Sequence, residues 1–155
     1  MALDDDIRFL RRISTFRVLG PDALRVLAIS TEKIHLRAGD TLFEGGEPAD
    51  GAYVLLAGVI RLRRANERAF DEPALVQAGA LIGESALIVE ADRPVAAIAV
   101  EHSTLFKVSR GVFLRVLESD PNAAQALRAM VARRVKVALS DLDTVLPRFE
   151  QDGAS

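Results

Sequence analysis

Two charged residues, Glu84 and Arg93, stand nine positions apart in a mostly apolar segment, LIGESALIVEADRPVAA, which spans residues 81–97. A charged side chain inside an apolar environment is unstable unless it is paired or hydrogen-bonded. Three interpretations follow: the two side chains pair with each other, they point to solvent, or they serve a ligand.

The ligand interpretation is specific about chemistry. Gly83, directly before the acid, lets a ligand approach the backbone closely. Free N–H groups at the start of a short helix bind phosphate, and an arginine adds a planar fork of donors for phosphate oxygens. A carboxylate beside them suits a sugar hydroxyl instead. The pattern therefore indicates a site for a nucleotide sugar-phosphate.

The composition is that of an ordinary globular domain. The chain has 155 residues, of which 50% are hydrophobic and 27% charged, with a net charge of −2. This length is enough for one domain with a real core, and the charge offers no basic field to attract nucleic acid. The absence of cysteine excludes disulfides and thiol chemistry. No apolar run is long enough to cross a membrane, and the N-terminus lacks a signal-peptide pattern, so we expect a cytoplasmic protein.

The elements that must position these residues fall into three parts. Residues 7–30 are predicted to be helical, with Ile7, Leu10, Ile13 and Phe16 at helical spacing and a second short helix opening at Pro21. Residues 31–109 contain short runs cut by glycine and turn residues, which predicts strands of a sandwich or barrel. Residues 111–147 are predicted to be helical again.

The last predicted helix is unusually long. After a short helix around Val112 to Leu117, Asp120 is the expected N-cap and Pro121 the first helical residue. Residues 122–146 contain no glycine or proline, carry one apolar seam, and would reach ~35 Å as a helix. This helix either packs only on its own domain or pairs with a second copy to form a homodimer.

These residues carry a resemblance to a known family. GESALIVEADRPVAA resembles the phosphate-binding cassette of the cyclic nucleotide-binding domain family, with Gly83 and Glu84 followed by Arg93. The upstream run LRAGDTLFEGGEPADGAYVLLAGVIRL and the helical segments on both sides are also similar, so the resemblance covers about residues 7–140. It implies a single domain, residues 1–155, mainly β with flanking helices. Its centre would be a double-stranded β-helix, a jelly-roll-like β-roll, over 31–109, with the cassette at 82–97.

The resemblance also implies a ligand, cyclic AMP or cyclic GMP, with no other cofactor. Glu84 would accept a hydrogen bond from the ribose 2′-hydroxyl, Arg93 would face the cyclic phosphate, and nearby backbone amides would complete the site. The implied binding residues are Gly83, Glu84, Ser85, Ala86, Arg93, Pro94 and Val95. In such domains the final helix closes over the base, so residues 122–146 would relay occupancy to a protein effector whose identity the sequence does not give.

Two residues depart from the family pattern. Pro94 stands where the family commonly has alanine, serine or threonine, and it has no N–H to donate. Losing one hydrogen bond to a charged group costs ~1.5–3 kcal/mol, or about ten- to a hundredfold in affinity. Asp92 replaces a small residue or proline and could compete for Arg93. Neither Pro94 nor Val95 offers a hydroxyl for guanine.

Other function classes have less support. A DNA-binding regulator would need ~60–80 further residues with a helix-turn-helix, and the printed chain ends at Ser155, so we expect no nucleic-acid binding. A metal-dependent barrel enzyme needs clustered histidines, whereas His35 and His102 are far apart in sequence. No nucleophile motif is present, so we expect no catalytic or metal site. The alternative to a messenger sensor is a β-roll interaction module that binds no cyclic nucleotide tightly.

Overall fold

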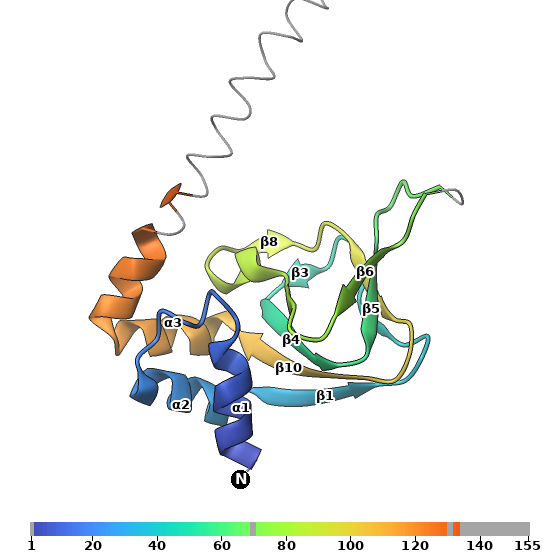
Figure 1. The fold of residues 1–155 in the computed structure, drawn as a ribbon. Helices are drawn as coiled ribbons and strands as arrows, with labels where there is room; N and C mark the ends of the chain where they lie inside the picture. The colour runs from blue at the N-terminus through green and yellow to red at the C-terminus, as the bar shows by residue number, and fades with distance from the viewer. Residues whose placement is uncertain (1, 69–70, 130–131, 134–155) are drawn as a thin grey trace, which may run out of the picture.

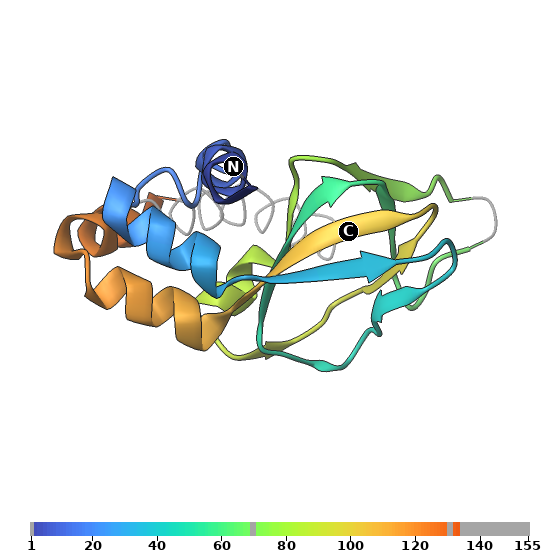
Figure 2. The same ribbon diagram turned by 90° about the horizontal axis from the view of Figure 1, so that it is seen from below.

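The computed structural model describes residues 2–68, 71–129 and 132–133, with helices before and after a strand-rich centre (Figure 1). The helices are α1 (Ala2–Arg11), α2 (Pro21–Ser30) and α3 (Arg110–Glu118), and residues 121–129 are helical as well. Viewed from below, α2 and α3 lie next to each other at one end of the strands (Figure 2).

The strands form a β-roll. They are β1 (Glu32–Leu36), β2 (Thr41–Phe43), β3 (Pro48–Ala49), β4 (Gly51–Ala57), β5 (Val59–Arg63), β6 (Ala74–Gln77), β7 (Leu81–Ile82), β8 (Ala91–Asp92), β9 (Ala96–Ala99) and β10 (Ser103–Ser109). In the described residues, two four-stranded sheets have the orders β1-β10-β4-β7 and β2-β9-β5-β6, and β3 pairs with β8. Every pairing is antiparallel. The predicted fold class, mainly β with flanking helices, is confirmed.

Strands β4 and β10 separate two apolar clusters, because successive side chains of a strand point to opposite faces. Tyr53, Leu55 and Leu105 pack inside the roll, whereas Val54 and Phe106 pack against the helices. The strands pair with Leu55 opposite Leu105 and Val54 opposite Phe106. The helices are therefore held on the outer face of the sheet whose inner face lines the roll.

The N-terminal helix is shorter than its apolar spacing predicts. It ends at Arg11, and Ile13 and Phe16 lie in the turns that follow. The amide of Ile13 donates to Leu10 O and that of Phe16 to Ile13 O, each at 3.0 Å, which is the i to i+3 pattern of 3₁₀ turns. Such turns also bring every third residue to one side, so both side chains are still buried. The second helix begins at Pro21 as predicted.

The predicted stop before the last helix is confirmed. The Asp120 carboxylate accepts a hydrogen bond from Ala123 N at 3.1 Å, as an N-cap does, and residues 121–129 are helical. Most of the predicted helix over 122–146 lies outside the described residues. Its length and its pairing with a second copy therefore stay predictions.

Candidate functional site

The cassette, residues 82–97, turns sharply between β7 and β9. Gly83 follows β7 with φ +77°, a left-handed conformation that glycine adopts without the penalty of a side chain. The 3₁₀ helix η1 (Glu84–Leu87) starts at once, and β8 leads back through Arg93 to β9. Arg93 N donates to Glu47 O, and Gly46 N donates to Arg93 O, both at 2.7 Å. The backbone of Arg93 is thus fixed by the loop before β3.

A cavity of about 230 Å³ lies against the cassette and the inside of the roll. The predicted binding residues that line this cassette cavity are Gly83, Ser85, Ala86, Arg93, Pro94 and Val95. Asp92 of the cassette also lines the cavity, and apolar side chains from other strands include Phe43, Leu62 and Val76. These apolar residues could not be identified from the sequence, because which strands face the cassette depends on sheet topology.

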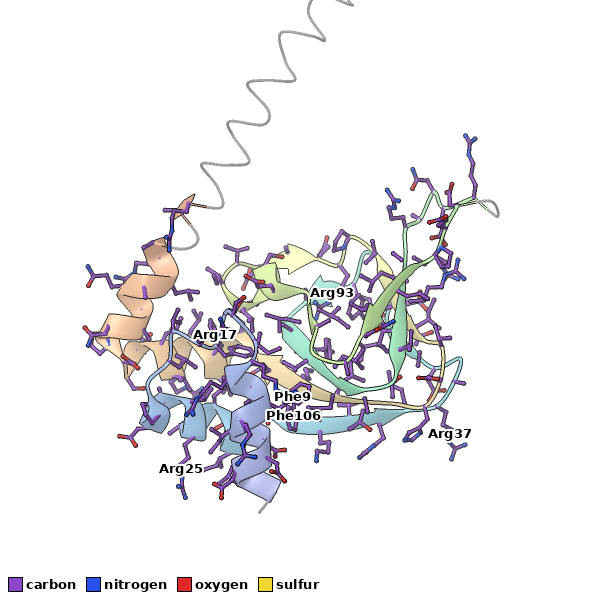
Figure 3. All side chains as sticks on the ribbon, viewed as in Figure 1. Phe9, Arg17, Arg25, Arg37, Arg93 and Phe106 are labelled. Atoms are coloured by element: carbon purple, nitrogen blue, oxygen red, sulfur yellow. The ribbon has the colours of Figure 1, made fainter. Side chains whose placement is uncertain are left out.

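The guanidinium of Arg93 is buried inside the roll, with the residue only 5% exposed (Figure 3). Its Nη2 donates to Gly51 O at 2.8 Å. Its Cζ lies 4.4 Å from the ring centre of Phe43 and 5.5 Å from that of Tyr53, within the range of cation–π attraction. In the part of the chain that the structure describes, no ion pair involves Arg93. The site therefore presents a desolvated positive charge to the cavity.

Glu84 lies elsewhere. It lines a separate surface depression together with Arg12, Thr15 and Gly79, and its side chain is half-buried. The structure thus brings six of the seven predicted binding residues to the cassette cavity and places Glu84 beside the segment that follows α1. Its role toward a ribose hydroxyl stays a prediction.

Asp92 does not hold Arg93 in the way that the sequence allowed. It is exposed on β8, opposite Pro48 of β3, and the described residues show no ion pair between it and Arg93. Backbone pairing of β8 with β3 fixes the Asp92 backbone, while the Arg93 side chain enters the roll. Pro94 lies at the cavity wall, so the backbone N–H that proline lacks is a hydrogen-bond donor missing at the cavity itself.

The two histidines are closer than their sequence positions suggest. The rings of His35 and His102 stack with centres 6.2 Å apart, and Thr104 Oγ1 lies 3.3 Å from His35 Nδ1. Pairing of β1 with β10 brings them together, since Leu36 lies opposite Ser103. Among residues 2–68, 71–129 and 132–133, no group of three or more His, Cys, Asp or Glu side chains is arranged to hold a metal ion. None of the helices described there is long and apolar enough to span a bilayer.

Comparison with known proteins agrees with this architecture. A sequence model described as the cyclic nucleotide-binding domain matches residues 33–120. The chain is 30% identical over 137 residues to the cyclic AMP receptor protein of Thermus thermophilus, covering 88% of this chain and 62% of that protein. The chain also matches two further relatives and covers still smaller shares of their length. It therefore spans less than two thirds of the length of each of these three proteins.

Two solved structures are similar along nearly their whole length. A cyclic nucleotide-binding-like protein from Brucella abortus is 38% identical with a TM-score of 0.66, covering 74% of this chain and 99% of that one. The N-terminal domain of a transcriptional regulator from Streptomyces coelicolor is 30% identical with a TM-score of 0.77, covering 86% and 94%. Given the cassette geometry, the β-roll and a family match over more than half of its residues, the chain belongs to the cyclic nucleotide-binding domain family.

Proposed function

We propose that this domain is a cytoplasmic sensor that binds a cyclic nucleotide in the cassette cavity, with the cyclic phosphate against Arg93. The observation that carries the proposal is the buried guanidinium. Its described partners are one carbonyl oxygen and two ring faces, none of which carries a full negative charge. Because a desolvated charge is stabilised most by an opposite charge with matching hydrogen bonds, an anionic ligand is favoured at this wall.

Cyclic AMP is the proposed messenger. Its name appears in that of the Thermus relative, and Pro94 and Val95 provide no hydroxyl for a guanine base. The cavity of about 230 Å³ is smaller than typical ligand sites of ~300–1,000 Å³. The ribose phosphate would therefore occupy the cavity and the base would lie at its mouth.

Residues 122–146 would form the lid and relay occupancy to a protein effector or to a second copy. A ligand shifts such an equilibrium only by its difference in affinity for the two states. Light scattering with and without cyclic AMP tests whether ligand changes the oligomeric state.

Calorimetry with cyclic AMP and cyclic GMP tests the binding proposal. Arg93→Met keeps the apolar stem and removes the guanidinium, so we expect affinity for cyclic AMP to fall at least ~10–100-fold. Arg37→Met is the matched control, because Arg37 is exposed and far from the cavity (Figure 3). Chromatography of the recovered nucleotide should show unchanged cyclic AMP, as expected for binding without hydrolysis.

A second candidate is a β-roll interaction module that binds no messenger tightly. Three observations favour it: Arg93 is already bonded to Gly51 O, Pro94 lacks an N–H, and Glu84 lines a different depression. The same titration separates the two functions. If folded wild-type protein gives neither heat nor a thermal shift with millimolar cyclic nucleotide, the module is supported and the sensor is rejected.

A further inference from the structure

Arg110, the first residue of α3, makes an unusual set of contacts. Its Nη1 lies 2.9 Å from Ala49 O, 3.1 Å from Ala86 O and 3.2 Å from Val89 O. The side chain is only 20% exposed, and its ion pair with Glu90 is long, at 3.8 Å to a side chain that is 91% exposed. The described bonds of this guanidinium are thus mainly to backbone carbonyls.

The position of Arg110 within its helix opposes helix electrostatics. A cation in the first turn lies at the positive end of the helix dipole, where acidic residues are favoured. The N-cap role belongs to Ser109, whose hydroxyl accepts from Val112 N at 3.3 Å. A basic residue at this position does not stabilise α3 itself. Its contribution comes instead from the carbonyl groups to which it donates.

Two of those carbonyls belong to the cassette. Ala86 lies in η1 and Val89 is the second residue after it, at the end where helical carbonyls lack intrahelical partners. Arg110 supplies these partners from α3. A displacement of η1 must therefore either carry Arg110 with it or break these hydrogen bonds.

The third carbonyl links Arg110 to Arg93. Ala49 O accepts from Arg110 Nη1, Asp50 O accepts from Arg110 N at 2.7 Å, and Gly51 O accepts from Arg93 Nη2. Three consecutive carbonyls thus join the guanidinium at the cavity to the first residue of α3. A substituent on Gly51 would meet the backbone of Val108 and Ser109, so this turn is also tightly packed against the end of β10.

We propose that Arg110 is a positioning residue that couples η1 and the turn at residues 49–51 to α3, so that movement at the cavity is transmitted to the helix. The coupling of η1 to α3 exists without ligand. Its use in signalling rests on the proposed function, because only a ligand at the cassette would drive the movement.

Amide hydrogen exchange followed by NMR tests the ligand-free coupling. The reporters are the amides of Ile88 and Val89, which both donate to Ser85 O at 3.2 and 3.1 Å. In Arg110→Met we expect their exchange to rise at least about tenfold, as for loss of hydrogen bonds to a charged group. Arg115→Met makes the same chemical change at an exposed position of α3 and should leave them unchanged.

Arg110→Lys provides the conservative comparison, because an ammonium group has three donors on a shorter stem. We expect it to restore part of the protection, and it decides the question if Arg110→Met does not fold. Unchanged exchange at Ile88 and Val89 in Arg110→Met overturns the proposal. So does an equal rise in the amides of β10, since that result means general destabilisation.

A second measurement adds saturating cyclic AMP. In the wild-type protein we expect changed exchange in both η1 and α3, whereas in Arg110→Met the change should be confined to η1. An identical response of α3 in the two proteins overturns the coupling. If wild-type protein binds no cyclic nucleotide, the proposed function fails, and the ligand-free comparison alone decides the role of Arg110.

Discussion

At the residue scale, Gly83 and Arg93 depend on each other. A β-carbon on Gly83 would meet the Nη1 atom of Arg93 at closer than van der Waals distance. The glycine therefore does two things: it adopts the left-handed conformation that starts η1, and it leaves room for the guanidinium.

Substitution of Gly83 by alanine separates these two roles. Gly83→Ala should displace the Arg93 guanidinium and weaken cyclic AMP binding by ~10–100-fold. Gly79→Ala is the control, because Gly79 also has a positive φ, +98°, but a β-carbon there meets nothing within 4 Å. Both variants should lose ~1–2 kcal/mol of stability from backbone strain. Equal affinities of the two variants in calorimetry would contradict the steric role of Gly83.

At the element scale, one carboxylate connects the starts of two helices. Asp120 accepts from Gly20 N at 2.9 Å, just before α2, and from Ala123 N at 3.1 Å in the following helical segment. These hydrogen bonds, first that from Gly20 and then that from Ala123, lower the pKa of Asp120 below its ordinary value. The ionised side chain thus holds the two helical ends together across a hundred residues of sequence.

This lowered pKa predicts a pH dependence. A carboxyl group with a lower pKa in the folded state stabilises the fold above the unfolded-state value of ~3.9, and the contribution is lost as pH falls through the folded-state pKa. Asp120→Asn should therefore lower the free energy of unfolding at pH 7. The difference from wild type should shrink toward pH 2 in urea titrations. A difference independent of pH would show that the charge of Asp120 is not involved.

The alternation of β4 supports a second prediction at the element scale. Leu55 is fully buried inside the roll, whereas Leu75 on β6 is 52% exposed. Leu55→Ala should lower the free energy of unfolding by ~2–5 kcal/mol through lost burial and a residual cavity. Leu75→Ala should change it by less than ~0.5 kcal/mol. Chemical denaturation of both variants checks that Leu55 is buried inside the roll and that Leu75 lies on its surface.

At the scale of the whole molecule, ligand binding and stability are linked. If cyclic AMP binds only the folded state, a concentration of 100 times Kd adds ~2.7 kcal/mol to the free energy of unfolding. Thermal unfolding should then shift upward in Tm by several degrees. Arg93→Met at the same ligand concentration should show a clearly smaller shift, because a ~10–100-fold loss of affinity leaves only ~0.4–1.4 kcal/mol of stabilisation. A shift of equal size in both proteins would place the ligand outside the cassette cavity.

Much of this architecture follows from local sequence. Turn glycines, apolar alternation and the caps at Pro21 and Asp120 depend on residues close together in the chain, so the order of helices and strands and the fold class were predictable. Six of the seven binding residues that the resemblance implied line the cavity, and residues that were not predicted make up the rest of its wall. The helix end at Arg11 was missed, because 3₁₀ turns and an α-helix share a spacing of three residues.

The sequence by itself determined which elements form and which family the chain resembles, since both depend on short-range pattern. Only the tertiary structure decided that Arg93 lies against the rings of Phe43 and Tyr53, that Glu84 lines another depression, and that Arg110 reaches the cassette. These contacts join strands and helices that are distant in the chain. They follow from sheet order and from the direction of each side chain, which no local pattern specifies.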